Sequence, residues 1–419
     1  MKCKPDALRA AVALALGAAL LPAAHATNGY FAHGYGIKAK GMGGAGLALA
    51  QDAFAGANNP AQAAFAGNRM EAGLELFMPD REMERTDAGP LVTAVRSDKR
   101  LFFVPEFGYN VALSNKLGVG ISVYGNGGMN TTYPGGQIDC GMGPANALCG
   151  MGNLGVDLTQ LIVAPTIAYQ VAEGHSLGVS PLLVYQQFSA YGLQAFAPNS
   201  VDNTGATVTN AGHDSSTGLG VRLGYLGRFG ERFSVGVSYS PKISMSRFKD
   251  YAGLFADGGK FDIPENMGVG VAFQATPAVQ VALDYNRINY SGVPAIGNAP
   301  TAGPLGGSPG GGFGWSDVNI VKLGVQWQMN ERTTLRFGIN RGDNPVPATG
   351  FITPNVLAPG VMKTHITLGG TYAMNKSSEL SWHFMHAPRV SVTGDSLLAG
   401  RETISMRQNA LGVQWGLKF

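Results

Sequence analysis

Gly41-Met42-Gly43-Gly44-Ala45-Gly46 is the centre of a stretch, residues 27–67, that also contains Asp52 and Asn59-Pro60-Ala61. The stretch is rich in Gly and Ala, carries few charges and lacks the regular bulky apolar side chains of a strand or core helix. Glycine-rich backbone packs where side chains leave no room and reaches positive φ without strain. Pro60 fixes its own φ and keeps Asn59 out of the helical region. We therefore interpret residues 27–67 as a compact plug, or hatch, that fits inside another structure.

The first 26 residues have the pattern of a secretory signal peptide. Basic residues precede a short apolar run, residues 10–21, and Ala24-His25-Ala26 supplies a small-x-small cleavage site. The run is too short to span a bilayer as a helix. Removal of this segment takes three of the 30 basic and one of the 27 acidic residues, which leaves a net charge of +1. Nothing in this balance indicates a nucleic-acid partner.

The remainder, residues 68–419, alternates between apolar and small or polar side chains. At the C-terminus, Leu411, Val413, Trp415 and Leu417 are separated by Gly412, Gln414, Gly416 and Lys418. Period two indicates strands with one apolar face. The connections alternate between short turns and long Gly- and Pro-rich segments, as in outer-membrane barrels with short periplasmic turns and long outer loops. The sequence therefore predicts an all-β protein, a transmembrane antiparallel β-barrel.

About fourteen strands fit between these connections, and a barrel in lipid has to close because an open sheet edge has no hydrogen-bond partners there. The expected spans are 68–84, 99–113, 116–130, 154–172, 175–193, 214–228, 231–248, 261–275, 278–291, 315–329, 332–343, 361–374, 378–393 and 402–419.

Several stretches in this order resemble the FadL/TodX family of outer-membrane transporters for long-chain fatty acids and other hydrophobic compounds. They are the hatch motifs already quoted, Val104-Pro105-Glu106-Phe107 to Tyr124-Gly125, Arg336-Phe337-Gly338-Ile339 with Asp343-Asn344-Pro345-Val346-Pro347, Thr371-Tyr372-Ala373-Met374-Asn375 and the terminal strand. The resemblance covers essentially the whole mature chain. It implies a fourteen-stranded barrel closed by an N-terminal hatch in a Gram-negative outer membrane.

The resemblance also implies a mechanism. Substrate is caught by the outer loops, passes to a pocket near the hatch, and leaves sideways through a kink in the third strand into the outer-membrane lipids. Gly125-Asn126-Gly127-Gly128 lies in the matching strand, and glycine inside a strand marks a bulge or bend. We expect Asn59-Pro60-Ala61 to lie at the wall close to these glycines. Phe31, His33 and Tyr35 are candidate substrate-binding residues, and fatty acids and aromatic hydrocarbons both remain open as cargo.

Cys140 and Cys149 are the two cysteines left in the mature chain, and they lie in the long segment after the third expected strand. An even count in an exported protein favours one disulfide. No histidine or further cysteine accompanies the pair, so the sequence predicts no metal site there.

No catalytic constellation or cofactor motif is found in the sequence. His383 and His386 lie in one expected strand and point to opposite faces, which disfavours a shared metal. An outer-membrane lipase or acyltransferase and a general diffusion porin remain as alternatives; we expect no enzyme activity and no cofactor. Basic residues on or near strands could hold a fatty-acid carboxylate through paired hydrogen bonds; they are Arg222, Lys242, Arg247, Lys322, Arg336, Arg341, Lys363 and Arg389.

Phe419 ends the chain on an aromatic residue, and the resemblance implies that it is a signal for the barrel-assembly machinery. An interfacial girdle residue is the plainer interpretation. We expect the folded protein to be a monomer.

Overall fold

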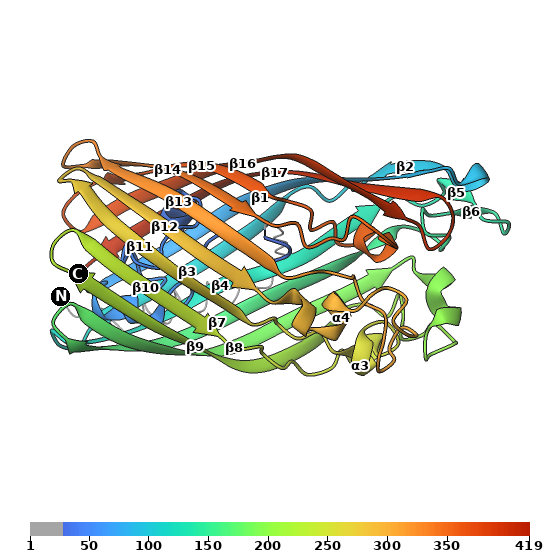
Figure 1. The fold of residues 1–419 in the computed structure, drawn as a ribbon, viewed down its shortest axis with the longest axis horizontal. Coiled ribbons are helices and arrows are strands. Elements are labelled where there is room, and N and C mark those ends of the chain that lie inside the picture. Colours follow the sequence, from blue (N-terminus) through green and yellow to red (C-terminus); the bar gives the residue numbers. More distant parts are fainter. Residues whose placement is uncertain (1–27) are drawn as a thin grey trace.

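The computed structural model describes residues 28–419, so the expected signal peptide lies outside the described residues (Figure 1). One antiparallel sheet of 15 strands follows the chain in order, and its last strand pairs with its first to close a barrel. The strand β2 pairs only with β1, so the closed ring has fourteen members. The expected fold class is confirmed.

The barrel strands are β1 (Arg69–Thr86), β3 (Phe102–Ala112), β4 (Leu117–Tyr133), β7 (Leu154–Ala172), β8 (His175–Tyr191), β9 (Asp214–Phe229), β10 (Phe233–Ser240), β11 (Asn266–Thr276), β12 (Val279–Ile288), β13 (Val318–Gln328), β14 (Thr333–Gly342), β15 (Thr364–Ala373), β16 (Ser378–Asp395) and β17 (Arg401–Lys418). The short elements are β2 (Thr93–Arg96), β5 (Ile138–Asp139), β6 (Pro144–Ala145), α2 (Ile37–Lys40), α3 (Ala256–Gly259), α4 (Pro294–Gly297) and the 3-10 helices η1 (Pro60–Ala64), η2 (Gly89–Leu91), η3 (Gln194–Asn199), η4 (Lys249–Tyr251), η5 (Tyr290–Gly292) and η6 (Thr353–Val356). None of the helices between Asn28 and Phe419 has the length and apolar character needed to cross a membrane.

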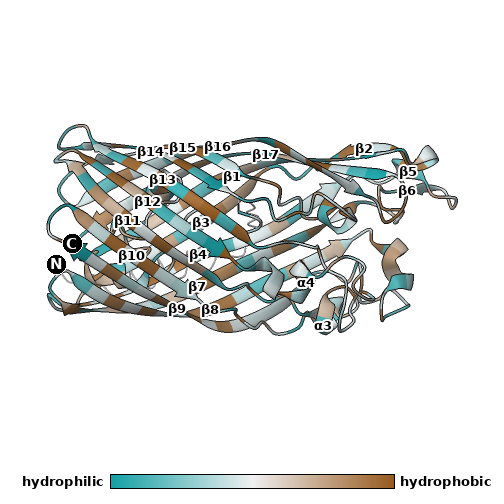
Figure 2. Cartoon of the chain, in the orientation of Figure 1, coloured by the Kyte–Doolittle hydropathy of each residue, from teal (hydrophilic) through white to brown (hydrophobic). Residues whose placement is uncertain are grey.

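The alternation along the strands places apolar side chains on the outer surface of the barrel. On β17, Leu411, Val413 and Trp415 are 40–48% exposed, whereas the intervening Gly412 and Gln414 are buried and face the lumen. The hydropathy colouring shows brown and teal residues alternating along the strands (Figure 2). Such an outer surface suits lipid, as the period of two predicted.

The strand boundaries differ most from expectation at β10, which ends at Ser240 rather than near residue 248. Pro241 follows, and proline cannot donate to a sheet ladder. The chain after it continues through isolated bridges, Gly218 with Met245 and Ile243 with Ile263, until β11 begins at Asn266. The wall between the end of β10 and the start of β11 is therefore built from irregular chain, residues 241–265.

The N-terminal segment, residues 28–67, is enclosed by the barrel. Its backbone N–H groups bind side chains of strands on different sides of the wall: Ile37 donates to Gln414 Oε1 of β17 (3.0 Å) and Gly43 to Thr367 Oγ1 of β15 (2.8 Å). On β12, Asp284 Oδ2 accepts from Gly46 (2.8 Å) and Leu47 (3.0 Å). Contacts around the whole ring place the segment inside the lumen.

At Gly43 and Gly44 the backbone of the N-terminal segment lies directly against other backbone atoms. Gly43 has φ +69° and Gly44 has φ +82°, conformations that L side chains rarely adopt. A Cβ on Gly44 would lie 1.8 Å from the His33 carbonyl oxygen, and a Cβ on the wall residue Gly338 would lie 2.0 Å from the Gly43 nitrogen. Glycine is required at these positions because a side chain would clash within the segment at Gly44 and between the segment and the wall at Gly43 and Gly338.

Candidate functional site

A large apolar cavity of about 550 Å³ lies at the end of the barrel that carries the long loops. Strands β4, β7 and β8 contribute one wall, and loops contribute the rest. The lining consists of Met129, Leu148, Val156, Leu158, Phe188, Leu193, Phe196, Pro198, Asn199, Ser200, Leu254, Phe255, Phe261, Ala295, Pro300, Thr301, Gly303, Pro304, Leu305, Gly311, Gly312, Phe313, Thr353, Pro354, Leu357 and Leu397. No charged side chain belongs to this lining. The cavity suits an uncharged hydrophobic molecule, because binding would remove apolar surface from water without burying a charge.

Hydrogen bonds hold the loops around the cavity in place. Asp202 follows the lining residues Asn199 and Ser200 and accepts hydrogen bonds from the hydroxyls of Thr204 and Thr207, both at 2.6 Å. These bonds hold the pKa of the Asp202 carboxyl well below its usual range, because they favour the charged form. The carboxylate therefore braces this loop throughout the neutral range.

Aromatic rings lead from the cavity toward the N-terminal segment. Phe255 packs on Phe261 with ring centroids 4.9 Å apart, and Phe261 lies 6.0 Å from Tyr30. Tyr30 also contacts Tyr290 at 5.4 Å. The inner boundary of the site is thus an aromatic surface that includes a residue of the N-terminal segment.

The wall is incomplete beside Tyr30, between β3 and β4. These strands pair only where residues 107–112 face residues 118–123, although β4 continues to Tyr133. Beyond Tyr124 the β4 strand pairs with β7 alone, and its register shifts between Gly125 and Gly127 because Asn126 is an extra, bulged residue. At the far end of β4, the segment between β2 and β3 closes the gap, where the Asp98 N–H donates to the Thr132 carbonyl (2.8 Å). The expected irregularity at the glycine cluster is present.

Residues 30–32 of the N-terminal segment lie against the inner side of this gap. Ala32 donates to the Asn126 carbonyl (3.2 Å), and Gly128 donates to the Tyr30 carbonyl (3.2 Å). A Cβ on Gly127 would lie 2.0 Å from the Tyr30 oxygen, so only glycine permits this approach. The glycine cluster therefore serves both as a bend in the wall and as a docking strip for the segment.

Met129 joins the large cavity to this region. It lines the 550 Å³ cavity and also a small void of about 20 Å³ that reaches Tyr30, Gly128 and Trp315. Two hydrophobic side chains, Met129 and Tyr30, thus lie between the cavity and the gap. Methionine is unbranched and adapts its shape readily, so a small displacement here can connect the two spaces.

The three candidate substrate-binding residues lie below the large cavity and do not line it. Phe31 forms an isolated bridge with Gly127, and the Tyr35 hydroxyl donates to Asn126 Oδ1 at 3.0 Å. His33 stacks with His365 of the wall, ring centroids 5.9 Å apart, and lies 6.0 Å from the His383 ring. Phe31 and Tyr35 therefore contact the gap, and His33 belongs to a buried cluster in the lumen.

Asn59-Pro60-Ala61 lies at the wall, but its wall contacts are on other strands than expected. Asn59 Nδ2 donates to the Tyr225 carbonyl of β9 (2.9 Å), and the Ser176 hydroxyl of β8 donates to the Ala61 carbonyl (2.9 Å). The residues that dock on the glycine cluster are Tyr30–Ala32. The expectation for the triplet was wrong in this respect, because residues 30–32 already occupy the inner side of β4 at the glycine cluster and the triplet docks two to three strands further along the ring.

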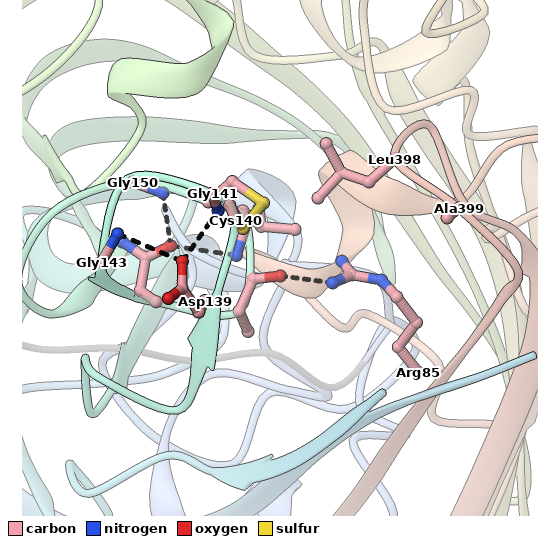
Figure 3. The surroundings of a disulfide bond; sticks show 12 residues. Arg85, Asp139, Cys140, Gly141, Gly143, Gly150, Leu398 and Ala399 are labelled. Carbon is pink, nitrogen blue, oxygen red and sulfur yellow. Dashed lines mark hydrogen bonds between the residues drawn. A yellow bond between two sulfur atoms is a disulfide. The ribbon is translucent and has the colours of Figure 1, made fainter. Parts of the chain in front are cut away.

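Cys140 and Cys149 form the expected disulfide, with 5.7 Å between their Cα atoms. The bridge joins the residue after β5 to a residue beyond β6. Asp139 Oδ1 of β5 accepts the N–H groups of Gly141 (2.7 Å) and Gly143 (3.1 Å) in the turn between the two strands (Figure 3). Arg85 of β1 fastens the loop to the rim by donating to the Ala147 carbonyl at 2.7 Å. The next residue, Leu148, lines the large cavity. The bridged loop thus supplies part of the candidate binding surface.

Several titratable side chains inside the barrel make structural contacts. His383 Nε2 lies 2.8 Å from Glu75 Oε2, whereas His386 hydrogen-bonds Asn409 on the outer face, so the two histidines point to opposite sides as expected. Arg222 donates to the Gly56 carbonyl (2.9 Å) and to the Tyr124 hydroxyl (3.0 Å). Among the described residues, no group of three histidine, cysteine or acidic side chains is arranged to hold a metal ion.

Residues 20–396 match the family described as outer membrane protein transport proteins, OMPP1/FadL/TodX. The chain belongs to this family. As a FadL/TodX member it is a transporter for hydrophobic compounds in the outer membrane of a Gram-negative cell, which confirms the resemblance drawn from the motifs. No curated protein sequence matches the chain.

Solved structures share the FadL/TodX fold with this chain at low sequence identity. The Pseudomonas putida toluene transporter TodX has a TM-score of 0.69 at 19% identity, covering 92% of this chain and 99% of TodX. The Ralstonia pickettii toluene transporter TbuX scores 0.63 at 18%, covering 92% and 99%. A Pseudomonas aeruginosa FadL homologue scores 0.68 at 14%, covering 93% and 100%. These likenesses show the fold.

The lining of the large cavity was missed by sequence reasoning. Most of its residues come from Gly- and Pro-rich loops, where no periodicity reports which side chains face inward. A signal was nevertheless present, because those loops carry aromatic and leucine residues such as Phe196, Phe255 and Phe313 that an unstructured loop would not need.

Proposed function

We propose that this FadL/TodX member admits small uncharged hydrocarbons, of the size of toluene, and releases them sideways into the membrane between β3 and β4. The proposal rests on the uncharged lining of the 550 Å³ cavity, which adjoins the gap between β3 and β4 at Met129. TodX and TbuX are named as toluene transporters. A fatty-acid carboxylate would find no cation in the cavity lining, so the lining favours neutral cargo.

The energetics support capture without trapping. An aromatic ring buries about 150–250 Å², which at about 25 cal/mol per Å² gives roughly 4–6 kcal/mol of favourable transfer free energy. That range corresponds to a dissociation constant of about 0.04–1 mM before the costs of immobilisation. Passage from the cavity into lipid costs little because both are apolar, whereas release into aqueous periplasm forfeits the gain. Sideways release into lipid therefore costs less free energy than release into the periplasm.

Residues 28–67 act in this proposal as a hatch that blocks water-soluble solutes. Asn59-Pro60-Ala61 and the motif with Gly43 and Gly44 anchor the hatch, and Asp52 caps Phe54 by accepting its N–H at 3.1 Å. Tyr30, Phe31 and Ala32 cover the gap and have to shift when substrate leaves. The protein functions as a monomer inserted by the barrel-assembly machinery.

A matched pair of loop substitutions tests the cavity. Leu305 lines the cavity and Leu91 does not; both are partly buried leucines in outer loops. Leu305→Lys should lower toluene uptake by cells at least tenfold, because the charge must be desolvated when toluene fills the cavity. Leu91→Lys should leave uptake near wild type. Equal uptake in the two variants would refute the cavity as the binding site.

Two further assays separate the alternatives. Decanoate uptake well above toluene uptake would reassign the cargo to fatty acids. Hydrolysis of an ester substrate by the purified protein would favour the lipase or acyltransferase alternative, and equal passage of a sugar would favour a diffusion porin.

A further inference from the structure

A second large space lies at the opposite end of the barrel, where the strands are joined by short turns. It has a volume of about 630 Å³ and is bounded by residues 48–51 of the hatch and by the wall. Six of its lining residues are cationic; they are Lys38, Arg69, Arg228, Arg232, Arg336 and Lys418. Only Glu231 and Glu379 in the lining are acidic. The space is therefore strongly basic, in contrast to the uncharged cavity at the outer end.

The acidic residues satisfy only half of these cations. Glu379 pairs with Lys38, with Arg69 at 2.8 Å and with Lys418 at 2.9 Å. Within residues 28–419, Arg228, Arg232 and Arg336 form no ion pair. Positive charge thus exceeds negative charge in the lining of this space.

Arg336 is the most unusual of the three. Its side chain is 5% exposed and donates only to neutral groups, Gln326 Oε1 at 3.0 Å and Thr371 Oγ1 at 2.7 Å. A buried guanidinium without an acidic partner is costly, and proteins ordinarily pair it. Its two hydrogen-bonded neighbours fix the plane of the guanidinium at the boundary of the basic space. A bound oxyanion would supply the missing charge through charge-assisted hydrogen bonds.

The geometry points to an oxyanion-binding site under the hatch, with Arg336 at its base and Arg228 and Arg232 at its rim. The ligand is an organic carboxylate or a phosphate ester, because Leu49 and Phe233 add apolar surface to the same lining. The exposed rim arginines attract anions from the periplasmic side. Leu49 belongs to the hatch and Arg336 to β14, so a bound anion contacts both the hatch and the wall.

Binding to the purified full-length protein in non-ionic detergent tests the site, with sodium benzoate and inorganic phosphate as probes in a calorimeter. Wild type should bind benzoate saturably at low salt, and binding should weaken as NaCl is raised. Arg336→Gln should weaken benzoate binding at least tenfold. Arg341→Gln is the matched control, because Arg341 lies on the same strand and is exposed on the outer face. No saturable binding in wild type, or equal binding in Arg336→Gln, would overturn the proposal.

Arg232→Gln provides a second variant in an exposed turn, should the buried substitution impair folding. It should weaken benzoate binding severalfold, and an unchanged affinity in a folded Arg232→Gln protein would also count against the site. Nanodiscs with phosphatidylglycerol, compared with phosphatidylcholine, distinguish a lipid headgroup from a free solute: competition with benzoate by the anionic lipid alone identifies the headgroup as occupant. Toluene uptake should stay at the wild-type level in both variants, so this result is independent of the uptake pathway.

Discussion

Asp284→Ala should release the hatch from the wall without unfolding the barrel. The Asp284 side chain is 1% exposed and accepts the N–H groups of Gly46 and Leu47 on one oxygen. Hydrogen bonds to a charged group contribute about 1.5–3 kcal/mol each, so the pair contributes roughly 3–6 kcal/mol to local docking. Loss of that free energy raises the local opening equilibrium about 10²–10⁴-fold. The two buried N–H groups would also be left without partners, which favours the opened state further.

Amide hydrogen exchange measures this effect directly, because protection of Gly46 and Leu47 reports local opening. Their exchange should accelerate by about two to four powers of ten, while the barrel keeps its heat-modifiable migration. Asp317→Ala is the control: the ion pair of Asp317 with Arg287, at 2.8 Å, is partly exposed on the outer wall and contributes about 0–1 kcal/mol. Cells with Asp284→Ala should also admit a hydrophilic dye. Unchanged protection of the two amides relative to Asp317→Ala would refute the assigned clamp.

Three further predictions concern the gap, the disulfide and the C-terminus. Gly127→Val should lower toluene uptake severalfold with normal surface expression, because its Cβ would lie 2.0 Å from the Tyr30 oxygen, whereas Gly292→Val meets no atom within 4 Å and should transport normally; equal uptake in the two variants would exclude this gap as the exit. Replacement of Cys140 and Cys149 by serine should lower loop stability by about 2–3 kcal/mol on the chain-entropy model and speed proteolysis of the loop, and an unchanged cleavage rate would contradict a stabilising role. Deletion of Phe419 should reduce the yield of folded barrel in the outer membrane more than deletion of a loop residue does; unchanged yield would leave its stacking on Tyr109, with ring centroids 5.8 Å apart, as its whole role.

The barrel could be predicted from the sequence because strand periodicity is local. The outward residues of β17 repeat every second position, and a slip of one residue would turn every apolar side chain into the lumen, so the register is strongly determined. The exceptions also had local causes that were overlooked: Pro241 ends β10 early because it has no N–H to donate. The disulfide was accessible for the same reason, since only Cys140 and Cys149 were left to pair.

The binding site could be predicted only in part, because it is assembled from residues far apart in the chain. The glycine cluster 125–128 indicated a bend in β4. Nothing in the sequence showed that Tyr30–Ala32, rather than Asn59, would dock on it. The aromatic character of Phe31 and Tyr35 indicated a binding role, and both residues contact the gap. The large cavity depends on how several irregular loops fold over the barrel mouth. The sequence of such loops has no regular repeat that shows which side chains point inward.

The sequence by itself determined the closed fourteen-strand barrel and the disulfide, since alternation, turn residues and cysteine count act at short range. Only the tertiary structure decided which charges are paired. Arg69 of β1 and Arg336 of β14 are both buried arginines, yet closure of the ring brings Glu379 within 2.8 Å of Arg69 and leaves Arg336 with neutral partners. Pairing of this kind depends on the stagger of strands around the barrel, which each strand's own residues do not encode.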